Sequence, residues 1–93
     1  MTIPGTPPRV VVFVRDGCHL CADALDTVAR VCADLAVDWT SVDIDADPAL
    51  RARYTDHVPV TVVDGRQLAL WFLDEASLRT ALADRGAPPP VGD

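Results

Sequence analysis

The sequence predicts an α/β fold in the order β-α-β-α-β-β-α, in which a four-stranded mixed sheet is flanked by helices. Residues 9–14 are a nearly continuous run of apolar, mostly β-branched side chains, typical of a central strand buried on both faces. Residues 18–35 repeat apolar positions at steps of three and four, as an amphipathic helix does. Asp64-Gly65 is a strong signal for a tight hairpin turn. At 93 residues the chain is one domain.

The first strand and the first helix are joined by a short turn. Asp16-Gly17 breaks the strand, and either residue is a candidate N-cap for the helix. The apolar face of this helix is formed by Cys21, Leu25, Val28, Cys32 and Leu35. Residues 37–44 read as a second strand. A strand, a helix and a strand in succession predict a parallel pair with a right-handed crossover.

The middle of the chain carries a short helix and a third strand. Asp47-Pro48 is a helix start, with an N-cap followed by proline at the first helical position, and the helix is predicted to end near Thr55. Residues 58–63 form the third strand, in which Pro59 lacks a ladder donor. From frequencies alone we expect a trans bond before this proline, because only about 5–6% of X–Pro bonds are cis.

The last strand and the last helix complete the fold. Residues 67–72 follow the hairpin turn as the fourth strand, and alternation predicts that one of Trp71 and Phe72 faces the core. The alternative is that Trp71-Phe72 is a partly exposed apolar patch used for docking. Asp74 is expected to cap a helix over residues 75–84, which Gly86 ends.

The predicted domain spans residues 9–85. Prolines and a glycine make residues 1–8 a flexible lead-in, and Pro88-Pro89-Pro90 predicts an extended or disordered tail over residues 86–93. The start of the chain lacks the basic and apolar regions of a signal peptide, and no apolar run approaches the ~20 residues of a membrane span. We therefore expect a cytoplasmic monomer that has no membrane contact.

The charge of the chain is acidic. Its formal net charge is -6 and its basic residues are all arginine, whereas nucleic-acid binding needs clustered lysine and arginine. We expect no nucleic-acid partner and interpret the scattered acids as a solvated surface. Asp43-x-Asp45-x-Asp47 resembles the start of an EF-hand loop. Pro48 and Tyr54 stand where that loop needs glycine and glutamate, so these aspartates are interpreted as strand-end and helix-cap residues.

The candidate chemistry lies in Cys18-His19-Leu20-Cys21, at the predicted turn from strand to helix. A helix N-terminus presents unpaired N–H groups and the positive end of the helix dipole, and both favour a thiolate, the reactive form of cysteine. Cys21 lies one turn deeper on the same side, where it can attack a mixed disulfide formed at Cys18. Redox chemistry is the interpretation we favour. Metal binding and two inert buried cysteines are the alternatives.

The neighbours of the dithiol have less specific signals. A protonated His19 and the charge of Arg15 can stabilise a thiolate, or both can be exposed residues with no specific task. Cys32 lies on the apolar helix face and is interpreted as core packing. Zinc takes sulfur and imidazole nitrogen, but a structural zinc site needs a second pair of ligands beside the first, and we predict neither a metal nor another cofactor. The candidate ligands for such a metal are Cys18, His19, Cys21 and His57.

Four segments together resemble the glutaredoxin and thioredoxin superfamily over most of the chain. They are the strand Val10–Val14, the motif Cys18-His19-Leu20-Cys21, the segment Val42-Asp43-Ile44-Asp45 leading into Asp47-Pro48, and His57-Val58-Pro59 before a hairpin. The similarity is greatest to a glutaredoxin-like group of small bacterial proteins. The resemblance implies the thioredoxin fold, a nucleophile at Cys18 and a resolving cysteine at Cys21. It also implies that Pro59 is cis and that the backbone of Val58 hydrogen-bonds a bound thiol substrate.

The sequence also departs from typical glutaredoxins. His19-Leu20 replaces Pro-Tyr between the cysteines, Arg15 replaces a lysine, and His57 replaces a threonine. The glycine pair that holds glutathione in glutaredoxins is missing from residues 70–75, where Asp74 could keep part of its role as a helix cap. Glutathione, another small thiol and a protein disulfide therefore all remain open as substrates.

The sequence thus predicts a thiol–disulfide oxidoreductase in which Cys18 attacks a disulfide and Cys21 resolves it. The residues predicted to bind or orient the substrate are Arg15, His19, Val58, Pro59 and Asp74. The alternative function is a non-catalytic binding module, or a metal or iron–sulfur carrier that uses the same cysteines. A carrier would show visible absorbance or stoichiometric metal, whereas a dithiol enzyme would be colourless.

Overall fold

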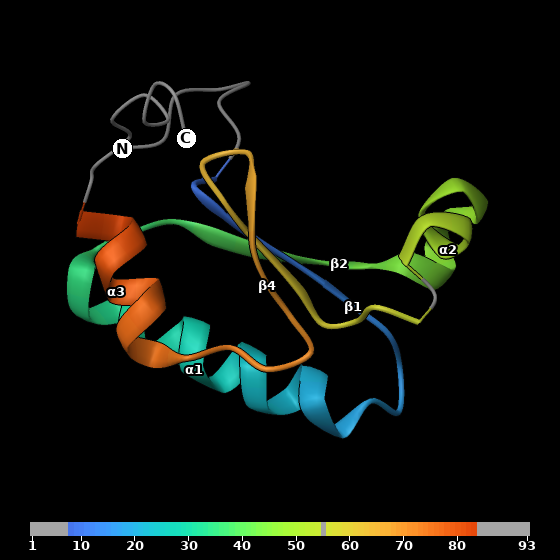
Figure 1. The fold of residues 1–93 in the computed structure, drawn as a ribbon, viewed down its shortest axis with the longest axis horizontal. Coiled ribbons are helices and arrows are strands. Elements are labelled where there is room, and N and C mark those ends of the chain that lie inside the picture. Colours follow the sequence, from blue (N-terminus) through green and yellow to red (C-terminus); the bar gives the residue numbers. More distant parts are fainter. Residues whose placement is uncertain (1–7, 55, 84–93) are drawn as a thin grey trace.

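The computed structural model describes residues 8–54 and 56–83, which form one sheet with helices packed on it (Figure 1). The elements are β1 (Val10–Val14), α1 (His19–Leu35), β2 (Trp39–Asp43), the short 3₁₀ helix η1 (Ile44–Ala46), α2 (Pro48–Tyr54), β3 (Val60–Val63), β4 (Arg66–Leu70) and α3 (Glu75–Ala83). Their order is the predicted one, with η1 added after β2. Apart from Pro8, the predicted lead-in and the predicted tail lie outside the described residues.

The sheet is mixed and has the strand order β2-β1-β3-β4. β1 pairs in parallel with β2, and Val10 lies opposite Trp39. β1 pairs in antiparallel fashion with β3, where Phe13 lies opposite Val60, and β3 continues into the antiparallel strand β4. The predicted four-stranded mixed sheet is therefore confirmed. Because successive residues of a strand point to opposite faces, this register decides which side chains share a face.

The core lies between one face of the sheet and the layer formed by α1 and α3, which lie side by side (Figure 1). Val10 and Val12 of β1 enter this core. The helices add Val28, Val31, Cys32, Leu78 and Leu82, all buried. Burial of each larger apolar side chain contributes about 1.5–3 kcal/mol, so this layer supplies most of the stability. The prediction that Cys32 is a core residue is confirmed.

The second helix packs on the other face of the sheet. Phe13 follows Val12 on β1 and so points away from the α1–α3 layer. Its ring stacks on Tyr54 of α2, with 4.7 Å between the ring centroids. In Figure 1, α2 lies at the opposite end of the molecule from α3. None of the helices in the described part of the chain has the length and apolar character needed to cross a membrane.

The start of α1 differs from the prediction. Neither Asp16 nor Gly17 is the N-cap, because the chain is still turning at both positions and Gly17 has a left-handed φ of 77°. The N-cap is Cys18, which has extended backbone angles and whose sulfur accepts a hydrogen bond from the first turn. A thiol is an unusual cap, so the sequence predicted Asp16 or Gly17 instead.

The end of β4 also differs from the prediction. The strand stops at Leu70, and Trp71 has a left-handed φ of 62°, which interrupts the alternation of faces. Trp71 is consequently 47% exposed and Phe72 75% exposed. The expectation that one of these residues faces the core is therefore wrong, and both aromatic rings lie at the surface.

Apart from the start of α1, the predicted turn and cap residues that the structure describes take their expected places; Gly86, the predicted end of the last helix, lies outside the described residues. Asp64 and Gly65 both have positive φ, as a tight hairpin turn requires. Asp74 accepts hydrogen bonds from the backbone N–H and the hydroxyl of Ser77, which caps α3. Asp43 and Asp47 accept backbone N–H groups at the starts of η1 and α2, which confirms that they are turn and cap residues.

Candidate active site

The dithiol lies at the connection between the end of β1 and the start of α1. Cys18 is the N-cap of α1, and its Sγ accepts a hydrogen bond of 3.1 Å from the backbone N–H of Cys21. The first N–H groups of a helix have no partner within the helix, and here one of them points at a sulfur. The same contact would stabilise negative charge on Cys18, since the positive end of the helix dipole adds to it.

The two cysteines differ in exposure. Cys18 is half-buried, whereas Cys21 is only 3% exposed, and both are free thiols. Burial and, next, the interaction with Cys18 together raise the pKa of the Cys21 thiol to about 11, against an opposing backbone hydrogen bond from Arg15. Cys21 is therefore held as a neutral thiol while Cys18 meets solvent. Burial also raises the pKa of Cys32, which lies in the core away from this site.

An open groove of about 540 Å³ gives access to the dithiol. It is lined by the end of β1, the turn at Asp16-Gly17, the first turns of α1 and the side of Asp43 at the end of β2. Arg15, Cys18, His19 and Cys21 are all part of this lining. The structure thus brings together four of the residues that the sequence singled out. It adds Asp43, whose position follows from the parallel register of β1 and β2, because parallel strands end at the same edge of a sheet.

The charges around the groove are mixed. The Nε of Arg15 hydrogen-bonds the carboxylate of Asp45 at 3.2 Å, and Arg51 contacts the same carboxylate at 3.3 Å. The cation next to the dithiol is therefore already paired with an acid. His19 is the first residue of α1 and is exposed.

The peptide bond between Val58 and Pro59 is cis, as the resemblance implies. Phe13 lies opposite Val60, so one further step along the register brings Pro59 beside Val14, which lines the groove. Pro59 is buried and Val58 is half-buried. The loop before β3 therefore reaches the same end of the sheet from which the chain leaves for Cys18.

Sequence reasoning missed Trp71 as a partner of this loop. Its backbone N–H donates to the carbonyl of Pro59 at 2.8 Å, and its indole N–H donates to the carbonyl of Asp56 at 2.9 Å. Its ring stacks on His57, with 6.4 Å between centroids and 15° between planes. The sequence held no signal for this pairing, because counting back from the Asp64-Gly65 turn pairs Trp71 with Val58. Only the register shift between Thr61 and Val62 brings Trp71 opposite Pro59.

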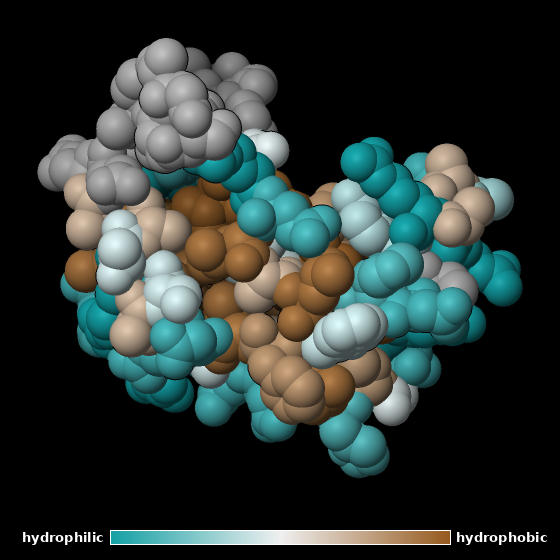
Figure 2. All heavy atoms as spheres, viewed as in Figure 1, coloured by the Kyte–Doolittle hydropathy of each residue, from teal (hydrophilic) through white to brown (hydrophobic). Residues whose placement is uncertain are grey.

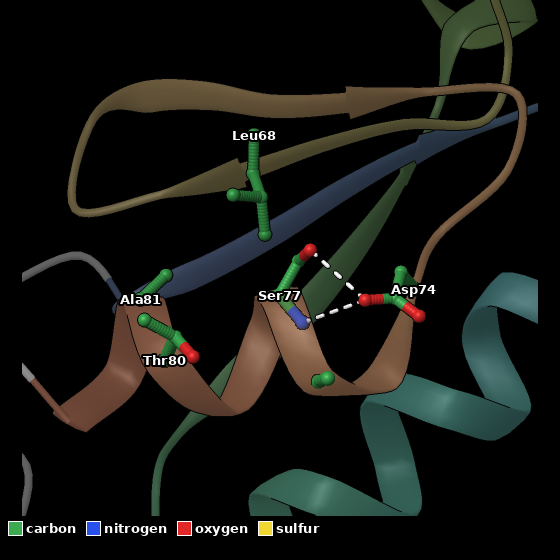
Figure 3. A pocket seen from close by; sticks show the side chains of 6 residues that line it. Leu68, Asp74, Ser77, Thr80 and Ala81 are labelled. Atoms are coloured by element: carbon green, nitrogen blue, oxygen red, sulfur yellow. Dashed lines mark hydrogen bonds between the residues drawn. The ribbon is translucent and has the colours of Figure 1, made fainter.

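Asp74 lies in a different place from the dithiol groove. Figure 2 shows apolar side chains at the surface between α3 and the β3–β4 hairpin. A second, smaller pocket of about 360 Å³ lies between β4 and α3, where Leu68 points toward the helix and Asp74 bonds Ser77 (Figure 3). Asp74 lines this second pocket and its carboxylate is engaged as a helix cap. The structure therefore does not bring Asp74 to the cysteines.

Metal ligation has little support in the geometry. Within residues 8–54 and 56–83, no three side chains among histidine, cysteine, aspartate and glutamate are grouped to hold a metal ion. His57 is stacked on Trp71, not gathered with the two cysteines. A pair of thiols alone does not complete the four-ligand set that zinc normally takes.

Comparison with known proteins agrees with this geometry. A family model described as a glutaredoxin-like domain (DUF836) matches residues 9–83. The chain is 34% identical over 89 residues to the uncharacterized protein Rv0508 of Mycobacterium tuberculosis, a match that covers 88% of this chain and 92% of that protein.

Solved structures show the same fold. The target protein XcR50 of X. campestris aligns with a TM-score of 0.66 and 36% identity, covering 85% of this chain and 99% of that one. The thioredoxin of Fasciola hepatica aligns with a TM-score of 0.56 at 24% identity, covering 80% of this chain and 76% of that one. The sheet and helices described above are therefore a thioredoxin-like fold that carries a Cys-x-x-Cys pair.

Proposed function

Because this chain belongs to the glutaredoxin-like domain family (DUF836), we propose that it is a thiol–disulfide oxidoreductase that uses Cys18 and Cys21. The observation that carries the proposal is the difference between the two sulfurs. Cys18 caps α1 and opens onto a groove, whereas Cys21 is buried one turn behind it as a neutral thiol. A nucleophile needs access, and a resolving thiol needs protection until the mixed disulfide has formed.

The proposed reaction transfers two electrons from the dithiol to a substrate disulfide. The Cys18 thiolate attacks one substrate sulfur, and the other substrate sulfur leaves as a thiolate that takes up a proton. Cys21 then gives up its proton and attacks the sulfur of Cys18, which releases the second substrate thiol. The protein ends with a Cys18–Cys21 disulfide, and an external thiol, small or protein-bound, reduces it for the next cycle.

The surrounding residues take supporting roles in this proposal. The backbone of Val58, held by the cis bond to Pro59, orients the substrate sulfur. His19 and Arg15 adjust the charge near Cys18, although the pairing of Arg15 with Asp45 weakens its share. A reducing cytoplasm is the compartment in which such a dithiol would be kept ready to act.

A redox titration tests the proposal. The purified protein is equilibrated with a thiol buffer at a series of potentials, and free thiols are alkylated and located by mass spectrometry. We expect one reversible two-electron couple between about -270 and -120 mV that maps to Cys18 and Cys21. The variant Cys32→Ser is the matched control and should keep the couple, whereas Cys18→Ser and Cys21→Ser should each remove it.

The same titration separates the proposal from the alternative functions. If Cys18 and Cys21 never form a reversible disulfide, the dithiol mechanism is wrong. Metal content measured on the same sample would then test the carrier alternative, since a carrier must hold metal in a fixed ratio to protein.

A further inference from the structure

Trp71 makes more contacts with the loop before β3 than its exposed position suggests. Its backbone N–H and its indole N–H donate to the carbonyls of Pro59 and Asp56, and its ring stacks on His57. One residue therefore holds three points of the segment 56–59. These contacts leave the outer part of the indole open, because Trp71 remains 47% exposed.

The backbone conformation of Trp71 is unfavourable for a residue with a large side chain. Its φ of 62° lies in the left-handed region, which glycine adopts freely and a bulky residue adopts at a cost. Such conformations in bulky residues persist where other contacts enforce them, and they concentrate at functional sites. A glycine would adopt this conformation after β4 without strain. The contacts or the function of the indole must therefore offset the cost of the left-handed backbone.

The position of Trp71 connects it to the dithiol groove. Extending the strand register by one residue places Val14, Pro59 and Trp71 in one row across β1, β3 and β4. Neighbouring strands are about 4.8 Å apart, so the Trp71 backbone lies roughly 10 Å from the strand that lines the groove. An extended chain covers about 3.3 Å per residue, so a few residues beside a substrate cysteine span this gap.

The groove itself does not favour a small anionic thiol. Glutathione carries two carboxylates and has a single residue on each side of its cysteine. The groove lining includes Asp16 and Asp43, and its cation, Arg15, is paired with Asp45. A polypeptide brings neither terminal carboxylate to the site and offers side chains that a flat aromatic surface can bind.

Resting on the proposed function, we infer that Trp71 determines the substrate class of the dithiol site. The stacked rings of Trp71 and His57 form an aromatic platform beside the Val58–Pro59 peptide. The chain that flanks the disulfide of a polypeptide substrate binds on this platform while Cys18 attacks. The preferred substrates are therefore disulfides in polypeptides, and the platform acts on binding and not on the exchange of sulfur bonds.

Single-turnover kinetics tests this inference. Reduced protein is mixed with excess disulfide, so the dithiol itself supplies the two electrons and two protons and no other reductant is needed. The first substrate is a peptide cyclised by one disulfide, and the second is bis(2-hydroxyethyl) disulfide, which has no chain to reach the platform. Trp71→Gly removes the indole and also relieves the left-handed backbone, so the variant is expected to fold, as circular dichroism will show.

For Trp71→Gly we expect the peptide concentration that gives half the maximal rate to rise by at least about fivefold. The rate with the small disulfide should fall by a clearly smaller factor, because any effect of the indole on the segment 56–59 acts on both substrates, whereas the platform acts on the peptide alone. His57→Ala removes the other half of the platform and should show the same pattern, which keeps the test valid if Trp71→Gly unfolds. Phe72→Ala is the matched control. The ring of Phe72 is more exposed and makes no stacking contact among the described residues. Its removal should therefore leave the kinetics with both substrates unchanged.

Two results would overturn the inference while leaving the oxidoreductase function intact. Parallel losses on both substrates would show that Trp71 only shapes the site, and an unchanged peptide dependence would show that no platform exists. A wild-type protein that reduces neither disulfide would instead overturn the proposed function, and the inference with it.

Discussion

The sulfur of Cys18 and the backbone N–H of Cys21 are joined by a hydrogen bond of 3.1 Å that closes the first turn of α1. The bond ties the proposed nucleophile to the residue that we propose resolves its intermediate. It also fixes Cys18 at the boundary between turn and helix, where the sulfur faces both solvent and the helix N–H groups. The first prediction follows from this arrangement.

Alkylation of the reduced protein should be strongly selective for Cys18. At pH 7 a thiol with a pKa of about 11, as at Cys21, has on the order of one thiolate in ten thousand molecules, and this residue is also buried. Cys32 lies deeper still. We expect iodoacetamide to modify Cys18 at least about tenfold faster than either of the others. Mass spectrometry of timed digests measures this order, and early labelling of Cys21 would contradict it.

The stability of the reduced protein should fall at alkaline pH. The pKa of Cys21 is raised from 9.0 to about 11 in the folded state, so the unfolded chain loses its proton first. The stabilising contribution is complete below pH 9 and is lost as pH rises through 11, by about 3 kcal/mol at most. Urea unfolding between pH 8 and 11 in a phosphine reductant measures it. In Cys21→Ala, stability should fall less steeply with rising pH, and the remaining fall is due to the buried thiol of Cys32. If stability falls as steeply in this variant as in the wild type, Cys21 is not the cause.

The hairpin turn should depend on the pair formed by Arg9 and Asp64. The guanidinium of Arg9 donates two hydrogen bonds, of 2.9 and 2.8 Å, to the carboxylate of Asp64. The hydrogen bond from Arg9 is the main reason that the pKa of Asp64 is lowered. Asp64→Asn keeps a residue that tolerates positive φ but removes the charge, and it should cost about 1 kcal/mol at neutral pH.

The pH dependence of this loss identifies its cause. Because the folded pKa of Asp64 is depressed, the stabilisation is present above pH 4 and is lost as pH falls through the folded value. The wild type and Asp64→Asn should therefore converge in stability once the pH has fallen through the depressed pKa of Asp64. Asp56→Asn, at another exposed aspartate, serves as the control and should change stability by less than about 0.5 kcal/mol.

The start of α3 should be weakened by loss of its cap. Asp74→Ala removes the acceptor of the Ser77 N–H and hydroxyl, each at 3.0 Å, and should lower the free energy of unfolding by about 0.5–2 kcal/mol. α3 contributes Leu78 and Leu82 to the core, so fraying at the start of α3 should weaken its packing against α1. Urea unfolding of this variant against Asp23→Asn, an exposed position on α1, gives the comparison, and equal stabilities would argue against the cap.

The order of elements could be predicted from the sequence because local signals and burial agree there. Val10–Val14 is a β-branched run, the apolar residues of α1 follow a helical period, and Asp64-Gly65 is compatible with positive φ at both positions. The Cys18-x-x-Cys21 pair could also be predicted from a local signal. The two residues are one helical turn apart, so the start of one helix is enough to bring them together.

The features that could not be predicted depend on contacts between distant segments. Cys18 is the N-cap in place of Asp16 or Gly17 because the chain is still turning at those two positions, where Gly17 has a left-handed φ. Trp71 leaves the strand pattern because its hydrogen bonds go to Asp56 and Pro59, which precede β3. No periodicity within residues 67–72 reports a bond to residue 56, so the position of the indole could not follow from the local pattern.

The strand order β2-β1-β3-β4 leaves β2 and β4 as the edges of the sheet, where another chain could add a strand. β2 presents exposed Thr40, Ser41 and Asp43, and β4 begins with exposed Arg66 and Gln67. The register shift between Thr61 and Val62 also disturbs the hairpin from which an added strand would have to continue. Polar, irregular borders of this kind discourage copies of the chain from pairing edge to edge, so the open sides of the sheet do not act as templates for aggregation.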